Sequence, residues 1–166
     1  VSLAGEAPDV IDSVVVLKVS GTLDVEVALP VVGEVGSLVL SADAAFIHNN
    51  EGSRQARVQH HEEIPNIGYW TDPQAWVEWA FQIDRPGQFE VHAELAVEQD
   101  TSCFRITLPN HQESVTVTST GSYYNYFKKS LSTLRIELAG KFTLSIKPEK
   151  DRWQPINLRQ LELKRR

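Results

Sequence analysis

The eight residues Trp76–Ile83 read WVEWAFQI, with an apolar side chain at every second position. Successive side chains of a β-strand point to opposite sides, so this spacing predicts a strand with one apolar face. We assign that face to the core: Val77, Trp79, Phe81 and Ile83. The stretch Phe89 to Leu95 alternates in the same way after the turn residues Arg85-Pro86-Gly87. We therefore expect the two strands to form a β-hairpin.

A second unit repeats this pattern further along the chain. Leu134, Ile136 and Leu138 alternate, Ala139-Gly140-Lys141 provides a turn, and alternation resumes at Phe142, Leu144 and Ile146. No stretch repeats apolar residues at helical spacing over three turns. Short strands separated by Gly or Pro turns, with two similar hairpins, predict an all-β fold, a jelly-roll β-sandwich of the galactose-binding-like type.

The N-terminal part follows a different pattern. Ser13–Val19 and Thr22–Leu29 read as one hairpin around Ser20-Gly21, and the glycine-containing stretch 33–36 reads as a linker. We assign residues 1–36 to the terminal strands of a preceding β-domain plus this linker, and residues 37–166 to the sandwich module. Because the chain starts at Val1 and contains no Met, we expect a fragment whose export signal lies elsewhere.

Composition excludes several classes of partner. The chain carries 22 acidic and 16 basic residues, a formal net charge of -6, which argues against nucleic acid and anionic membrane as partners. No apolar run approaches the roughly 20 residues of a membrane span. The lone Cys103 lies in a strand-like context and is expected to be a small core residue.

Catalytic motifs are missing from the sequence. It contains no nucleophile elbow, no phosphate-binding glycine loop and no Ser/His/Asp arrangement. The carboxylates Asp72, Glu78 and Asp151 lie in no recognisable glycosidase motif. The cluster His60-His61-Glu62-Glu63 would direct its side chains to both faces of a strand, so we interpret it as solvated polar residues. We expect a chain that is not an enzyme.

A resemblance to a known family rests on several motifs in succession. They are Asn66–Pro73 (NIGYWTDP), Trp76–Trp79, Pro86-Gly87, Thr120-Gly121 and Asn157–Arg159. This order resembles accessory modules that follow the catalytic domains of α-L-fucosidases and some sulfatases, and it is similar to carbohydrate-binding modules of families six and thirty-five. The resemblance covers about residues 37–166. Residues 9–29 also resemble the closing strands of the β-sandwich behind a fucosidase barrel.

The resemblance implies a non-catalytic, glycan-binding module of a secreted or periplasmic hydrolase, of α-L-fucosidase type. Its implied partners are a fucosylated or related polysaccharide and the catalytic domain of the same polypeptide. The alternative is a structural or interaction domain that packs on the catalytic domain without binding sugar. Such a domain would show an apolar patch that includes Trp153 or Trp70.

The resemblance also implies a ligand cleft at one end of the sandwich, with Tyr69, Tyr123, Tyr126 and Asn157 at the matching positions. We add the neighbouring Trp70 as a candidate. Sugars present an apolar face and a rim of hydroxyls, so flat aromatic rings with a few amides suit them. Tyr69 precedes the turn-forming Thr71-Asp72-Pro73, which predicts a ring on an exposed loop. The competing interpretation is that Tyr69, Trp70 and Trp76 pack over the sandwich edge.

Similar modules often hold a structural calcium ion. Calcium prefers several oxygen ligands, and the positions that could supply part of such a set are Asp43 and Glu162. An ordinary turn aspartate and an exposed strand glutamate are the alternative interpretation. No cofactor is required by anything in the sequence.

Overall fold

The computed structural model describes residue 20 and residues 28–32, 36–52 and 55–166. The hairpin expected at 13–29 lies almost wholly outside these residues, so the structure leaves it a prediction. In the described chain, the longest helices are two three-residue 3-10 turns, η1 (Ala42–Ala44) and η2 (Lys150–Arg152). No helix among the described residues is long and apolar enough to cross a membrane.

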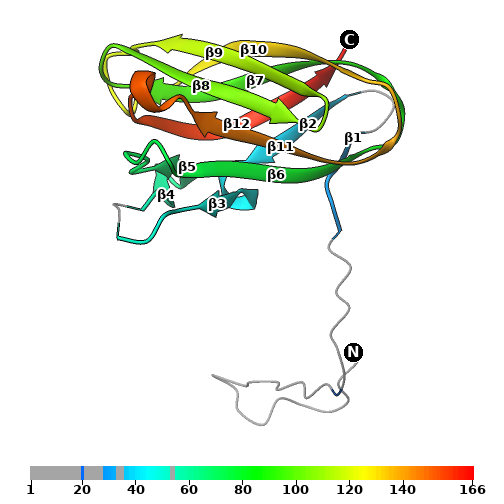
Figure 1. The fold of residues 1–166 in the computed structure, drawn as a ribbon, viewed down its shortest axis with the longest axis horizontal. Coiled ribbons are helices and arrows are strands. Elements are labelled where there is room, and N and C mark those ends of the chain that lie inside the picture. Colours follow the sequence, from blue (N-terminus) through cyan, green and yellow to red (C-terminus); the bar gives the residue numbers. More distant parts are fainter. Residues whose placement is uncertain (1–19, 21–27, 33–35, 53–54) are drawn as a thin grey trace.

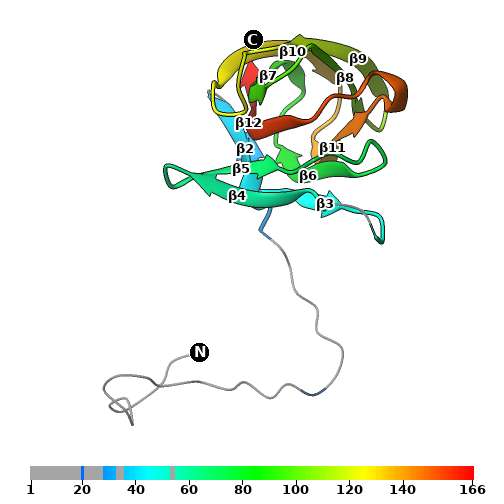
Figure 2. The same cartoon turned by 90° about the vertical axis from the view of Figure 1, so that its left-hand side faces the viewer.

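Two β-sheets stack on each other to form a sandwich (Figures 1 and 2). The first sheet runs in the order β1-β6-β11-β8-β9, and β3 also pairs with β6. Its strands are β1 (Val31–Val32), β3 (Phe46–His48), β6 (Trp76–Ile83), β8 (Thr101–Leu108), β9 (His111–Thr118) and β11 (Gly140–Pro148). The second runs β10-β7-β12-β5-β4, and β2 also pairs with β12. Its strands are β2 (Ser37–Ser41), β4 (Arg57–His61), β5 (Ile64–Gly68), β7 (Gly87–Val97), β10 (Phe127–Ile136) and β12 (Ile156–Arg165). The predicted all-β sandwich is confirmed.

The core lies between the two sheets and contains the predicted apolar faces. The alternating positions of β6 and the N-terminal part of β7 are at most 1% exposed: Val77, Trp79, Phe81, Ile83, Phe89, Val91, Ala93 and Leu95. Trp79 also donates a hydrogen bond from Nε1 to the Ser41 carbonyl, 2.7 Å away, which satisfies its one polar atom. Cys103 is buried and forms no disulfide, but it alternates with Phe104 on β8 and lies outside the core cluster, next to Thr116 of β9.

The two predicted hairpins are wrong. β6 and β7 lie in different sheets, and so do β10 and β11, so the turns at residues 84–86 and 137–139 are corners that carry the chain from one sheet to the other. Leu138, which we expected to alternate inward, lies in the second corner and is 75% exposed. Alternation identifies a strand and its inner face, but it does not identify the strand's hydrogen-bonding partner.

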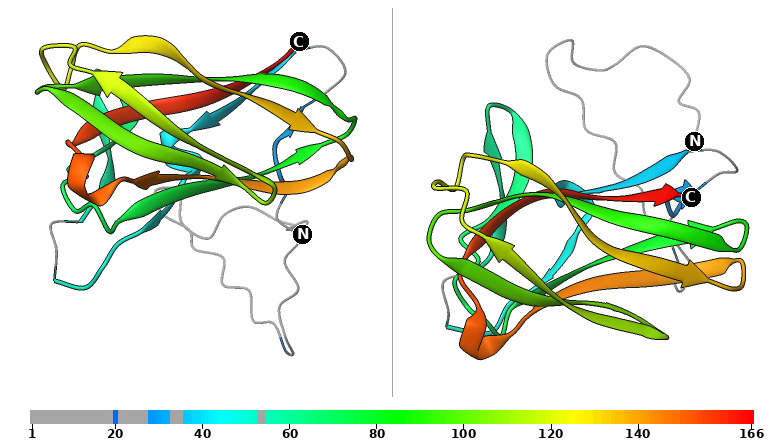
Figure 3. Two further views of the ribbon diagram at one scale, coloured as in Figure 1. Left: turned by 45° about the horizontal axis from the view of Figure 1, so that its top comes forward. Right: turned by 90° about the horizontal axis from the view of Figure 1, so that it is seen from above.

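The similarity of the two units nevertheless has a structural basis. The register pairs Gly87 with Ile136 in one sheet and Gly140 with Ile83 in the other. The two corners therefore lie side by side at one end of the sandwich (Figure 3). The units β6–β7 and β10–β11 run as paired ribbons that fold over the core together, which is the arrangement of a jelly roll.

Strand β1 lies upstream of the domain boundary that we predicted after residue 36. β1 lies within residues 1–36, yet Val31 and Val32 pair in parallel with Gln82 and Ile83. Gln82 further donates its backbone N–H to the Pro30 carbonyl, 2.9 Å away. Residues 30–32 therefore extend the first sheet at the edge of β6, and the division of the chain at residue 36 stays a prediction.

Candidate functional site

Four connections gather at the end of the sandwich opposite the two corners (Figure 1, left). They are residues 69–75, 98–100, 119–126 and 149–155. A pocket of about 180 Å³ opens among them, lined by Gln59, Tyr69, Thr71, Tyr123, Tyr124, Pro155, Ile156 and Asn157. Three predicted site residues, Tyr69, Tyr123 and Asn157, therefore lie around one pocket.

Tyr69 lies on an exposed turn at the pocket mouth. Its backbone adopts the left-handed conformation with φ 55°, and its carbonyl accepts a hydrogen bond from the Thr71 N–H at 2.9 Å. The residue is 53% exposed. The guanidinium of Arg57 lies 4.1 Å from the ring centroid and covers one side of the ring. The tight turn after β5 therefore presents the phenol as an edge of the pocket rather than as core.

Trp70 was predicted as a ligand contact, and the structure contradicts this. The residue is fully buried, and its Nε1 donates to the Ala75 carbonyl at 3.0 Å. Its ring packs 4.9 Å from that of Trp153, whose Nε1 donates to the Trp70 carbonyl at 3.1 Å. The two neighbours thus face opposite ways: Tyr69 lies outward in the pocket rim, and Trp70 fills the core beneath it.

Asn157 lies at the start of β12, where it forms the floor of the pocket. It is 5% exposed, and its Nδ2 donates to the Tyr123 carbonyl at 3.0 Å. Because that bond crosses from the last strand to the 119–126 loop, it fixes where Tyr123 lies relative to the floor. The burial of Tyr123 raises the pKa of its phenol, and the nearby Glu98 carboxylate raises it further.

The 119–126 loop is held by its own side chains. Thr120 Oγ1 accepts from the Val97 N–H at 3.1 Å, and Asn125 Nδ2 donates to the Thr120 carbonyl at 2.7 Å. Gly121 takes φ 81°, a conformation that most side chains disfavour. These contacts give the loop a defined shape, so its aromatic rings are positioned in advance of any ligand.

The sequence analysis missed five of the eight lining residues: Gln59, Thr71, Tyr124, Pro155 and Ile156. Tyr124 is 60% exposed and stacks on His61 with 4.4 Å between ring centroids. Gln59 reaches the pocket from β4, where its Nε2 donates to the buried Asn66 Oδ1 at 3.0 Å. The run of tyrosines after Thr120-Gly121 could have suggested Tyr124, whereas only the pairing of β4 with β5 brings Gln59 close.

Tyr126 was predicted as a site residue but does not line the pocket. Its ring lies under the Arg159 guanidinium, 3.7 Å away, and Arg159 pairs with Glu94 at 2.9 Å. Burial raises the pKa of the Tyr126 hydroxyl, and the nearby Asn157 and Arg159 side chains oppose this rise. Tyr126 therefore supports the loop from the outer face of the second sheet.

Gly68 provides the space that the pocket floor requires. A methyl group at this position would overlap Nε2 of Gln59 and lie 3.0 Å from Oδ1 of Asn157. Such a group can fit only if Gln59 leaves its place and gives up its hydrogen bond to Asn66. Asn66 is fully buried, so its carbonyl oxygen would lose a partner that water cannot easily replace.

We therefore expect Gly68→Ala to lower the free energy of unfolding by about 1–3 kcal/mol, the usual cost of one unsatisfied buried polar group. Urea unfolding measures this loss. In a Gln59→Ala background the added methyl group no longer collides with the Gln59 amide, so the further loss of unfolding free energy should be clearly smaller. Equal losses in both backgrounds would mean that the collision with Gln59 is not the cause.

The structure does not bring the two predicted calcium ligands together. Glu162 lies opposite Val39 in the β2–β12 register, and Asp43 follows Val39 by four residues along the chain. The Glu162 carboxylate pairs with Lys128 instead. Within the described ranges, no group of three or more His, Cys, Asp or Glu side chains could hold a metal ion. Bound calcium stays a prediction from the resemblance, without a ligand set in the described part of the chain.

The pairing of Glu162 predicts a small pH effect. The hydrogen bond from the Lys128 ammonium holds the pKa of the Glu162 carboxyl below its ordinary value of 4.5. A carboxyl whose pKa falls on folding contributes stability above its unfolded pKa and loses it as the pH falls through the folded value. The contribution of this surface pair should be below about 1 kcal/mol. The substitution Lys128→Met should raise the pKa of Glu162, which an NMR titration of the carboxyl groups measures. An unchanged pKa would exclude Lys128 as the cause of the shift.

Another aromatic cluster lies on the outer face of the first sheet. The His48 ring stacks on Trp76 at 3.6 Å with an interplanar angle of 6°, and the Lys147 ammonium lies 4.2 Å from the centroid of the same ring. β3 and β11 flank β6, so His48 and Lys147 approach Trp76 from opposite neighbouring strands. Both sides of the indole are covered, which makes it a poor stacking platform for a sugar.

Comparison with known proteins identifies the fold. No family model matches the sequence, and no curated protein matches it. A family 35 carbohydrate-binding module from Clostridium thermocellum is similar in structure, with TM-score 0.65 and 16% identity over 77% of this chain and 97% of that one.

Two further modules have the same architecture. The C-terminal CBM6 of LamC, a marine laminarinase from Zobellia galactanivorans, gives TM-score 0.62 and 15% identity over 78% of this chain and all of that one. The module CBM6cm-2 from Cellvibrio mixtus lichenase 5A, in complex with cellotriose, gives TM-score 0.58 and 14% identity over 77% of this chain and 96% of that one. The chain has the β-sandwich fold of family 35 and family 6 carbohydrate-binding modules.

Proposed function

We propose that this chain is a non-catalytic carbohydrate-binding module that holds one sugar unit of a glycan in the pocket among Tyr69, Tyr123, Tyr124, Gln59 and Asn157. The observation that carries the proposal is the convergence of three tyrosines and two amides from separate strands and loops on one pocket of about 180 Å³. Small ligand sites commonly combine apolar walls with a few well-placed polar groups.

The chemistry of the pocket suits a polyhydroxylated ring. The exposed rings of Tyr69 and Tyr124 offer apolar surface for the C–H face of a sugar, and the Gln59 and Asn157 amides offer donors and acceptors for hydroxyls. The Tyr123 phenol is protonated at neutral pH, as any tyrosine with an ordinary pKa is, so it can donate a hydrogen bond to a sugar hydroxyl. The pocket is smaller than the usual range for drug-sized ligands, about 300–1,000 Å³, which favours a single ring.

The biological context of the proposal follows from the resemblance. Carbohydrate-binding modules of this fold include parts of glycan-degrading enzymes, such as the laminarinase and the lichenase above. We expect this chain likewise to hold a secreted or periplasmic hydrolase on its substrate, with an α-L-fucosidase-type enzyme and a fucosylated polysaccharide as the specific expectation. The pocket lining itself carries no charged side chain, which favours a neutral sugar.

A glycan array followed by calorimetric titration tests the proposal. Plant, algal and host glycans, including fucosylated ones, are screened with the intact chain, and the best ligand is titrated against wild type and Asn157→Ala. We expect millimolar or tighter binding that weakens in the variant, because the Tyr123 loop loses its anchor. If a folded wild-type chain binds no glycan at millimolar concentration, the proposal is wrong.

The alternative of a structural domain predicted an apolar patch at Trp70 or Trp153. Both residues are buried against each other, so that patch does not exist. Exposed apolar surface occurs elsewhere on the described chain.

A further inference from the structure

Strand β4 contributes three alternate residues beside the sugar pocket. Arg57, Gln59 and His61 occupy every second position of the strand, so their side chains point to the same side of the second sheet. Val58, between them, pairs with the fully buried Ile67 and lies on the core side, which places the other three on the outer face. Gln59 lines the pocket itself, and each of the two others contacts an aromatic ring that lines it.

Arg57 contacts the ring of Tyr69 at the end of β5. It pairs with Gly68 in the β4–β5 register, and Tyr69 follows Gly68 directly along the chain. The guanidinium lies 4.1 Å from the ring centroid, and a cation over an aromatic face is attracted to it. Arg57 does not line the pocket, whereas Tyr69 does. The arginine therefore covers a part of the ring that the pocket does not use.

His61 has the same relation to Tyr124 at the other end of this row. The two rings stack with 4.4 Å between their centroids and an interplanar angle of 25°. Tyr124 lines the pocket, and His61 does not. Four residues along a strand span roughly 13 Å, at about 3.3 Å per residue. The row on β4 is thus long enough to reach aromatic rings on two different connections, 69–75 and 119–126.

Both tyrosine rings gain from such support because both are exposed. Tyr69 is 53% exposed and Tyr124 60%, and neither lies in a strand. A side chain that can change its rotamer in the free protein loses that freedom when a ligand binds to it, and the loss weakens binding. A ring that a neighbour already holds has lost most of this freedom beforehand, so its affinity for the ligand is higher.

We infer that Arg57 and His61 are positioning residues of the sugar site. Arg57 holds the ring of Tyr69, and His61 that of Tyr124, in the orientation that the glycan meets. The inference rests on the proposed function and deepens it, because it makes a single strand responsible for two walls of the pocket. Replacing either residue by Ala should weaken sugar binding about two- to tenfold, the range for one side chain that must be immobilised on binding.

The order of the tyrosine rings in the sugar-free chain tests the inference without any ligand. The chain has four tyrosines, so isotope-labelled ring carbons give few NMR signals to assign. Relaxation of these carbons should show the Tyr69 ring ordered in wild type and less ordered in Arg57→Ala, with Tyr124 unchanged. His61→Ala should loosen Tyr124 and leave Tyr69 unchanged. The conservative variants Arg57→Lys and His61→Phe keep a cation and an aromatic partner, so they should restore most of the order.

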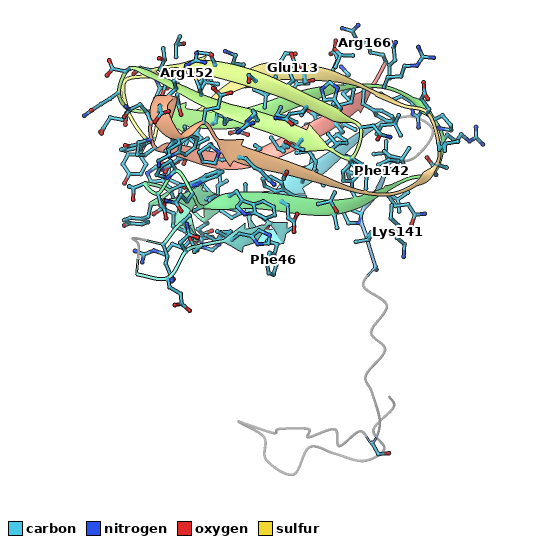
Figure 4. All side chains as sticks on the ribbon, in the orientation of Figure 1. Phe46, Glu113, Lys141, Phe142, Arg152 and Arg166 are labelled. Carbon is cyan, nitrogen blue, oxygen red and sulfur yellow. The ribbon has the colours of Figure 1, made fainter. Side chains whose placement is uncertain are left out.

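The same variants are then titrated with the best glycan from the array, and affinities are compared per folded molecule. One control is His60→Ala, an exposed histidine on the opposite face of β4. The other is Arg152→Ala. Figure 4 shows Arg152 in η2 at the same end of the sandwich, where its guanidinium pairs with Glu149 at 3.2 Å and not with a pocket residue. Both controls should bind sugar as wild type does.

The outcomes distinguish these positioning roles from the sugar site itself. If the folded wild-type chain binds no glycan, the sugar site is wrong and both roles are wrong with it. If wild type binds but the rings of Tyr69 and Tyr124 are as ordered in Arg57→Ala and His61→Ala as in wild type, the positioning roles are wrong and the site stands. Rings that loosen without any loss of affinity would overturn the roles as well.

Discussion

Trp70→Ala should lower the free energy of unfolding by about 3–5 kcal/mol, the range for large aromatic residues replaced by Ala in a core. Trp70 is fully buried, and the loss of its ring would leave Trp153 without its aromatic neighbour and the Ala75 carbonyl without the indole donor. Unfolding in urea measures the loss.

Tyr124→Ala provides the matched control for Trp70→Ala. Tyr124 is an aromatic residue at the same end of the sandwich, but it is 60% exposed, so its removal should cost less than about 1 kcal/mol. If Trp70→Ala were as mild as Tyr124→Ala, Trp70 would not belong to the core, and our correction of its predicted role would fail.

Tyr69→Ala should have the opposite profile from the variant at its neighbour. It removes an exposed ring from the pocket rim, and stacking of this kind contributes about 0.5–1.5 kcal/mol, which corresponds to a few-fold to tenfold loss of sugar affinity. Stability should change by less than about 1 kcal/mol, because the only ring contact described is the exposed one with Arg57.

Calorimetric titration of Tyr69→Ala beside Tyr69→Phe separates the contribution of the ring to sugar affinity from that of the hydroxyl. The Phe variant keeps the stacking surface and should bind better than the Ala variant. A large drop in melting temperature of Tyr69→Ala with unchanged affinity per folded molecule would assign Tyr69 to the core and remove it from the site.

The sequence predicted β6, β7, β10 and β11 with most of their inner residues, because a strand with one buried face carries an apolar side chain at every second position. It did not predict which strands pair. The turn at Arg85-Pro86-Gly87 looks like a hairpin turn, yet the chain leaves one sheet there and enters the other. The local pattern of residue types indicates where a turn lies. The partner of each strand depends on contacts between residues far apart in the sequence, such as Gly87 with Ile136.

The site was predictable to a similar extent. Tyr69, Tyr123 and Asn157 follow from the resemblance and line the pocket. Trp70 was assigned wrongly because adjacent residues in a tight turn can face opposite ways, and only the fold decides which one is inside. Gln59 carries no sequence signal, since it reaches the pocket through the pairing of β4 with β5.

A single NMR experiment tests the central claim that sugar binds among the loops at this end of the sandwich. The best glycan from the array is titrated into the isotopically labelled chain, and backbone amide shifts are followed residue by residue. We predict that the largest shifts map to residues 69–71, 120–126 and 156–157, with Gln59 also affected. Shifts centred on the outer face around Trp76, or none for any glycan at millimolar concentration, would contradict the account.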